Sequence, residues 1–274
     1  PRRCCVHERG LTCGRHQDSQ GEAMTARITT LGTSHGSHTY CRFNTATLVD
    51  VGDVSYLIDA GSPASALMLR GEKRIQPLRG VFLTHMHEDH AGGLPGVIKA
   101  LLKAPDPGQH TDVFLPEVEA RAGLEAWLVA IRLRWPSPLV TLRTVRDGPI
   151  YEDDLISLEA TRTKHLSDRY GPASFSYRMT IGDKRIVFTG DLSSDFSDFP
   201  AFAKSEPCDL CVCEMTHFPP EAALPTLMDS PIGRLVFNHI HDPWHGPGEA
   251  RLRAFFDELP YEFHIAHDGD EFEV

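Results

Sequence analysis

Three histidines and an aspartate fall within six residues, in the segment Thr84-His85-Met86-His87-Glu88-Asp89-His90. Imidazole and carboxylate groups at this density are typical of a metal site that awaits further ligands. Because His85 and His87 are two residues apart, an extended backbone points both imidazoles to one side, and a turn then brings Asp89 and His90 round. This geometry suits two adjacent metal ions better than one. Nitrogen and oxygen donors without thiolate favour zinc, with iron or manganese as substitutes.

The elements around this segment must position its side chains. The apolar run Gly80-Val81-Phe82-Leu83 predicts a buried strand before it, and residues 91–103, with Gly92-Gly93 near their start, predict a helix after it. The candidate ligands therefore lie on a strand-to-helix turn, where rigid elements hold a loop that carries chemistry. With the spacing HxHxDH in this context, the segment resembles the defining motif of the metallo-β-lactamase superfamily.

That resemblance implies an α/β fold of four layers (αββα), in which two mixed β-sheets are flanked by helices. It also implies seven metal ligands. One ion would be held by His85, His87 and His165, and the other by Asp89, His90 and His239. Asp191 would bridge the two ions. His239 has a competitor in His241, and the strand register favours His239.

The resemblance also suggests residues around the ligands. Asp59 closes the predicted strand 54–58, where an unpaired buried carboxylate would be costly. The superfamily places such an aspartate beside the metal site, where it orients a ligand, although an ordinary turn-capping role is the alternative. Candidates for catalysis, for stabilising developing charge, or for a substrate loop are Asp89, His217, His241, His35, Ser34 and Glu214.

Composition sets limits on the class of protein. The chain has 274 residues with 41% hydrophobic and 24% charged content, which is ordinary for one soluble globular protein. No stretch approaches the ~20 apolar residues of a membrane span. A net charge of -11 disfavours broad nucleic-acid binding. The seven cysteines are odd in number, and Cys211 and Cys213 lie in an apolar segment, so a reduced, cytoplasmic protein is expected.

The N-terminal residues 1–26 differ from the rest. They carry positive charge but no apolar core of a secretory signal. We expect a disordered leader or an artificial extension, with Met24 as the natural start, followed by one hydrolase domain over residues 27–274.

Further segments resemble the ribonuclease Z and phosphodiesterase branch of the superfamily: residues 31–36, Ser176-Tyr177-Arg178, residues 208–216 and Ala266-His267-Asp268-Gly269. Two departures stand beside them. Cys213 replaces the histidine that precedes the branch's glutamate, and the close spacing of His165 and Asp191 leaves no room for a long RNA-gripping arm. We therefore expect a small phosphodiester or nucleotide-type substrate rather than a large RNA, no membrane partner, and a homodimer as the assembly to test.

The reaction implied is hydrolysis. Two divalent ions, zinc by preference, would share a water and lower its pKa from ~15.7 toward ~7. The same site could instead hydrolyse a lactone, a thioester or a β-lactam. A mononuclear iron oxygenase and a non-catalytic binding protein are further alternatives. The flavodiiron branch is disfavoured because it has glutamate where this chain has His87.

Overall fold

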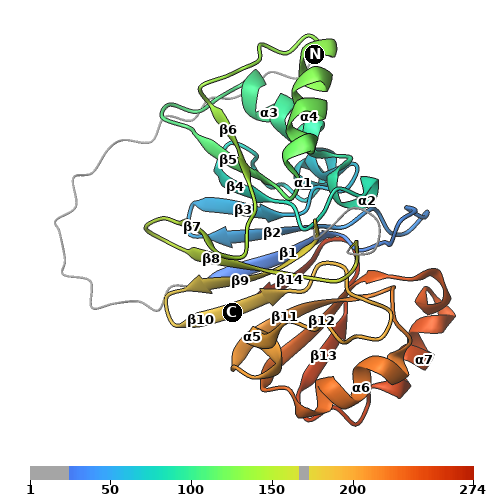
Figure 1. Cartoon of the computed structure of the whole chain (residues 1–274). Helices are drawn as coiled ribbons and strands as arrows, with labels where there is room; N and C mark the ends of the chain where they lie inside the picture. Colours follow the sequence, from blue (N-terminus) through green and yellow to red (C-terminus); the bar gives the residue numbers. More distant parts are fainter. Residues whose placement is uncertain (1–24, 167–172) are drawn as a thin grey trace, which may run out of the picture.

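Two stacked sheets of seven strands each form the centre of the protein (Figure 1). The computed structural model describes residues 25–166 and 173–274. One sheet has the strand order β14-β1-β2-β3-β4-β5-β6 and the other the order β13-β12-β11-β10-β9-β8-β7. Both contain parallel and antiparallel pairs. The expected α/β fold with two mixed sheets is confirmed.

The strands of the first sheet are β1 (Ala26–Gly32), β2 (Ala46–Val51), β3 (Val54–Ile58), β4 (Leu78–Phe82), β5 (Thr111–Leu115), β6 (Val140–Thr144) and β14 (Asp270–Glu273). Those of the second are β7 (Gly148–Glu152), β8 (Ser157–Arg162), β9 (Phe175–Ile181), β10 (Lys184–Phe188), β11 (Cys208–Met215), β12 (Ile232–Ile240) and β13 (Glu262–Ile265). The helices are α1 (Ala64–Arg70), α2 (Glu88–Ala91), α3 (Leu94–Lys103), α4 (Val118–Ala130), α5 (Ala201–Lys204), α6 (Pro220–Asp229) and α7 (Pro247–Phe255), with a 3-10 turn η1 (Asp242–Trp244).

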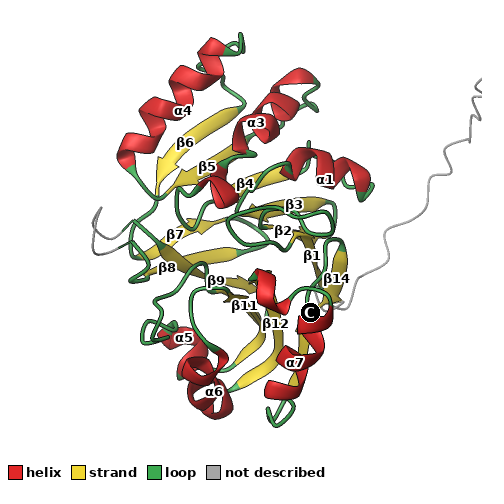
Figure 2. Ribbon diagram, turned by 90° about the vertical axis from the view of Figure 1, so that its right-hand side faces the viewer, coloured by secondary structure: helices red, strands yellow, loops and turns green. Residues whose placement is uncertain are grey.

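Three apolar clusters hold the four layers together. One lies between the sheets, one lies under α1, α3 and α4, and one lies under α5, α6 and α7 (Figures 1 and 2). Strand β4 shows how the sequence serves two of them, because Phe82 packs between the sheets while its neighbours Val81 and Leu83 pack toward the helices. A strand buried on both faces needs such a continuous apolar run.

The structure corrects one predicted element. The single helix expected from Ala91 is divided, because α2 ends at Ala91 and α3 begins at Leu94. A side chain on Gly93 would meet the carbonyl oxygens of Ala60 and Gly61 at 2.7 Å, so the backbone passes too close to the β3 end for any other residue. Asp89 and His90 consequently lie on the one-turn helix α2 rather than on an open turn.

Several strand ends meet at one edge of the stacked sheets. Parallel strands β10, β11 and β12 run side by side in one sheet, as β3, β4 and β5 do in the other. Their carboxyl ends lead into the segments that carry the candidate ligands, as is usual for sites in α/β proteins. Of the leader expected at residues 1–26, residues 1–24 lie outside the described residues, and Ala26 is the first residue of β1. None of the described helices is long and apolar enough to cross a membrane.

Candidate metal centre

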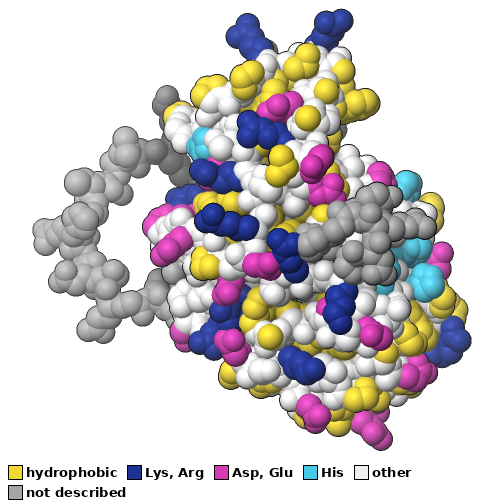
Figure 3. All heavy atoms as spheres, in the orientation of Figure 1, with side chains coloured by type: hydrophobic (Ala, Val, Ile, Leu, Met, Phe, Trp, Pro, Cys, Tyr) yellow, Lys and Arg dark blue, Asp and Glu magenta, His cyan; other side chains and the backbone are white. Residues whose placement is uncertain are grey.

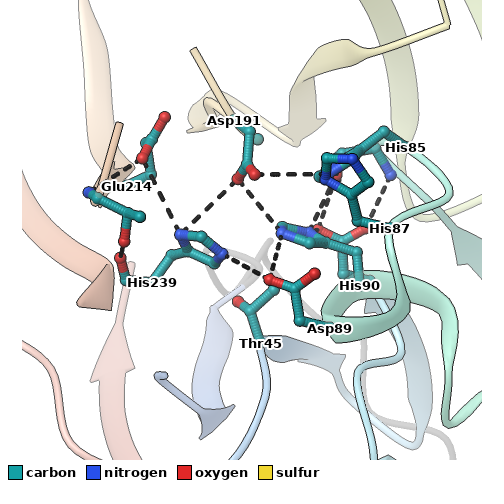
Figure 4. A network of polar contacts seen from close by, with 12 residues as sticks. Thr45, His85, His87, Asp89, His90, Asp191, Glu214 and His239 are labelled. Carbon is teal, nitrogen blue, oxygen red and sulfur yellow. Dashed lines mark hydrogen bonds and ion pairs between the residues drawn. The ribbon is translucent and has the colours of Figure 1, made fainter. Parts of the chain in front are cut away.

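The seven predicted ligands lie together at this edge, and they form two groups. Polar atoms of His85, His87, His165 and Asp191 lie within 4.8 Å of one another, and so do those of Asp89, His90 and His239. These residues come from the β4 end, helix α2 and the ends of β8, β10 and β12, which are far apart in the sequence. The fold thus brings all seven together, and Figure 4 labels six of them, all except His165.

Asp191 lies between the two groups and faces both. Its Oδ2 lies 3.4 Å from His85 Nε2 and 3.6 Å from His165 Nε2. Its Oδ1 lies 3.3 Å from His90 Nε2 and 3.8 Å from His239 Nδ1. One carboxylate oxygen is therefore directed at each group, which is the arrangement that a bridging ligand requires.

Three buried polar atoms at the centre lack hydrogen-bond partners. His90 Nε2, Asp191 Oδ1 and His239 Nδ1 form no hydrogen bond among the described residues. Buried polar atoms are normally paired, and each unpaired group needs an explanation. The donor set consists of imidazole nitrogens and carboxylate oxygens converging on common points, which fits divalent metal ions.

Ionisation of the carboxylates fits the same role. Burial raises the pKa of Asp191, but the imidazoles of His239, His90 and His85 more than offset it and hold this pKa well below its usual range. Asp89 behaves similarly: burial opposes its ionisation, yet the hydrogen bond from His239, at 3.0 Å, helps to lower its pKa to about 2. Both carboxylates are thus charged at neutral pH, as metal ligands must be.

Three strand-end residues at the centre adopt left-handed backbone conformations. The φ angles are 58° at Asp59, 56° at Gly190 and 50° at His239. Such conformations are uncommon outside glycine, although aspartate and histidine tolerate them better than most residues. They turn the chain sharply at the ends of β3, β10 and β12, and thereby direct Asp59, Asp191 and His239 into the centre.

Asp59 lies beneath His90 and binds it. Asp59 Oδ2 lies 2.8 Å from His90 Nδ1, while Oδ1 accepts a hydrogen bond of 2.7 Å from the backbone N–H of Thr84. The Thr84 hydroxyl lies 2.9 Å from Asp59 and 3.1 Å from His85 Nδ1. This arrangement leaves His90 Nε2 facing the centre. Thr84 was not predicted, although its place directly before His85 was a usable signal.

Glu214 and His217 form a pair beside Asp191. His217 Nδ1 lies 2.9 Å from Glu214 Oε2 and 3.6 Å from Asp191 Oδ2. Burial lowers the pKa of His217, but the hydrogen bond to Glu214 and the charge of Asp191 raise it to about 9 overall. Glu214 also accepts the backbone N–H groups of Leu192 and Thr216, so its position is fixed.

The remaining predicted residues have contacts other than the seven predicted ligands. Ser34 donates its hydroxyl to the carbonyl of Ser37, and His35 contacts Asp242 at 2.9 Å. His241 packs edge-on against His35, with ring centroids 5.3 Å apart. Among the described residues, Ser34, His35 and His241 form no hydrogen bond, ion pair or ring contact with the seven. The predicted strand around Cys211 and Cys213 is confirmed, and both thiols are free and buried.

Comparison with known proteins gives a consistent picture. The profile of the metallo-beta-lactamase superfamily matches residues 39–203, more than half of the chain. A ribonuclease Z of Synechococcus sp. (strain CC9902) is 30% identical over 154 residues, which cover 53% of this chain and 47% of that protein. The chain therefore matches about half the length of this curated relative.

Solved structures share the fold. The metallo-beta-lactamase fold protein YhfI from Bacillus subtilis aligns with a TM-score of 0.74 at 19% identity, covering 92% of this chain and 100% of that one. The short form of human tRNase Z aligns with a TM-score of 0.70 at 19% identity, and the alignment covers 90% of this chain and 98% of that one.

Proposed function

Because the chain belongs to the metallo-beta-lactamase superfamily, we propose that it is a hydrolase with two metal ions, acting on a small phosphodiester or nucleotide-type substrate. The observation that carries the proposal is the position of Asp191, whose two oxygens face two separate groups of donors. His85, His87 and His165 would hold one ion, and Asp89, His90 and His239 the other. The donor set favours zinc, with manganese or iron as substitutes.

When bound, the ions would supply Lewis acidity and an acidified water at neutral pH. The chain's own residues would do the rest. Asp59 fixes the tautomer of His90 by accepting its Nδ1 proton. His217, with Nδ1 held by Glu214, retains Nε2 as a proton carrier.

These roles account for a balanced reaction. Water would form a bond to phosphorus and the bond from phosphorus to the leaving oxygen would break, while His217 Nε2 would donate a proton to that oxygen. The proton lost by the attacking water would pass through solvent and restore the protonated form of His217. The products are a phosphomonoester and an alcohol. Besides holding the second ion, Asp89 would keep His239 in place through their 3.0 Å contact.

The small substrate is supported by the charge of the molecule. The net charge is -11, and on the face in Figure 3 the Lys and Arg side chains are interspersed with acidic ones. Between Phe175 and Phe188 the chain forms only the hairpin of β9 and β10. The ribonuclease Z relatives favour RNA as the second candidate substrate. Lactone, thioester or β-lactam hydrolysis, an iron oxygenase and a homodimer stay as predictions to test.

A substrate panel tests this function. The zinc-loaded protein is assayed with bis(p-nitrophenyl) phosphate, a transfer RNA precursor, a lactone and a chromogenic β-lactam, and its metal content is measured. We expect two metal ions per chain and turnover of the phosphodiester. Asp191→Ala should abolish turnover with folding intact, whereas the exposed control Asp183→Ala should not. One iron per chain, or turnover only of the lactone or β-lactam, would contradict the proposal.

A further inference from the structure

A cavity of about 490 Å³ opens beside His217. It lies between the end of β11, the start of α6, the turn η1 and helix α7, and its lining includes His217, His241, Phe218, Trp244, Arg251 and Phe255. The volume is in the range of small-molecule sites. Part of the lining is therefore the proposed proton donor, and other lining residues belong to α6 and α7, the helices at the lower right of Figure 1.

Another part of the lining is aromatic and carries a cation. Trp244 and Phe255 are half-buried, and Arg251 is exposed. The Arg251 guanidinium carbon lies 5.7 Å from the centre of the Trp244 ring, and Nη2 donates a hydrogen bond of 3.0 Å to the carbonyl of Pro243. Within residues 25–166 and 173–274, no carboxylate forms an ion pair with Arg251. Because the chain has a net charge of -11, an exposed arginine that forms no ion pair with a described carboxylate is a candidate to bind an anionic ligand.

We propose that this cavity binds the nucleobase of the substrate, with Trp244 as the stacking surface and Arg251 beside the sugar and phosphate. This inference rests on the proposed phosphodiesterase function. Stacking of a base on an aromatic ring is tolerant of base identity, and a planar guanidinium both stacks and binds phosphate. The position next to His217 would place the phosphodiester of a bound nucleotide at the metal centre.

The test compares two substrates with the same leaving group. Thymidine 5'-(p-nitrophenyl phosphate) carries a base, and methyl p-nitrophenyl phosphate does not. For each variant, the ratio of the two kcat/KM values is measured on the zinc-loaded protein. We expect Trp244→Ala to lower this ratio about tenfold or more, and Trp244→Phe to retain most of it. Arg251→Met should lower it to a smaller extent. Trp127→Ala, which removes an exposed tryptophan on α4, should leave it unchanged.

Binding is measured separately, by calorimetric titration with thymidine 5'-monophosphate, and thermal unfolding verifies that each variant is folded. A folded Trp244→Ala protein with the wild-type ratio and wild-type affinity would overturn the inference. If the wild-type protein hydrolyses neither ester but binds the nucleotide, and Trp244→Ala weakens that binding, the proposed function fails and the base site stands. If both esters are hydrolysed and the ratio does not respond to Trp244, the base site fails alone.

Discussion

Replacement of Asp59 by asparagine tests how the metal centre is held in register. The substitution keeps the side-chain shape, and asparagine tolerates the φ of 58° at this position. In the wild-type protein both carboxylate oxygens of Asp59 face donors, His90 Nδ1 at 2.8 Å and the Thr84 N–H at 2.7 Å. Asparagine replaces one of these two acceptor oxygens by an NH2 group. In either orientation of the amide, one donor meets another donor.

The expected loss depends on that orientation. If the NH2 group faces His90, the imidazole must place its proton on Nε2, the atom that faces the metal centre, and it can no longer bind an ion. A hydrogen bond to a charged group contributes about 1.5 to 3 kcal/mol, which corresponds to a roughly 10- to 150-fold weaker metal affinity. If it faces Thr84, a comparable loss appears in the free energy of unfolding instead.

Zinc affinity is measured by competition with a chromogenic chelator, and the free energy of unfolding by urea denaturation. The matched control is Asp53→Asn, an exposed aspartate in the turn between β2 and β3. Wild-type values of both quantities in Asp59→Asn would refute the reasoning, because they would mean that neither donor depends on the carboxylate.

Gly190→Ala should destabilise the protein more than Gly182→Ala, although both residues have positive φ. A Cβ atom at Gly190 would lie 2.6 Å from the Phe175 carbonyl oxygen, whereas a Cβ atom at Gly182 would have no described atom within 4 Å. By calorimetry, the free energy of unfolding should fall by about 1 kcal/mol in Gly182→Ala because of the left-handed backbone. It should fall by a further ~1–3 kcal/mol in Gly190→Ala because of the clash, and equal losses in the two variants would contradict this. Removal of metal by a chelator should lower the unfolding temperature and re-addition of zinc should restore it, since saturation at 100 times Kd stabilises by about 2.7 kcal/mol; an unchanged transition would speak against a resident ion. Burial opposes ionisation of Asp153, but hydrogen bonds led by the one from Tyr56 hold its pKa below 3.8. The ionised Asp153 side chain therefore stabilises the fold fully above pH 3.8, and this contribution is lost as the pH falls below that value. The urea midpoints at pH 7 and pH 3 should consequently differ less in Asp153→Asn than in the wild type.

The sequence alone located the first motif and the strand that precedes it, because both are local. The continuous apolar run of residues 80–83 predicted a buried strand, and the structure places Phe82 and Val81 in the clusters on its two faces. The spacing of His85 and His87 predicted two imidazoles on one side. The break at Gly93 was missed, since it depends on the approach of the backbone at Ala60, a contact between segments that are distant in the sequence.

The resemblance named His165, Asp191 and His239 as further ligands, but only the tertiary structure shows that they lie beside that motif. Each is a single residue at or near a strand end, and its local sequence does not show which distant residues it meets. The stacking of the two sheets aligns the ends of β8, β10 and β12 with the end of β4, and it leaves His35 and His241 outside the group. Local periodicity fixes the direction of a side chain relative to its own strand, whereas convergence depends on sheet order and register, which are set by contacts across the whole chain.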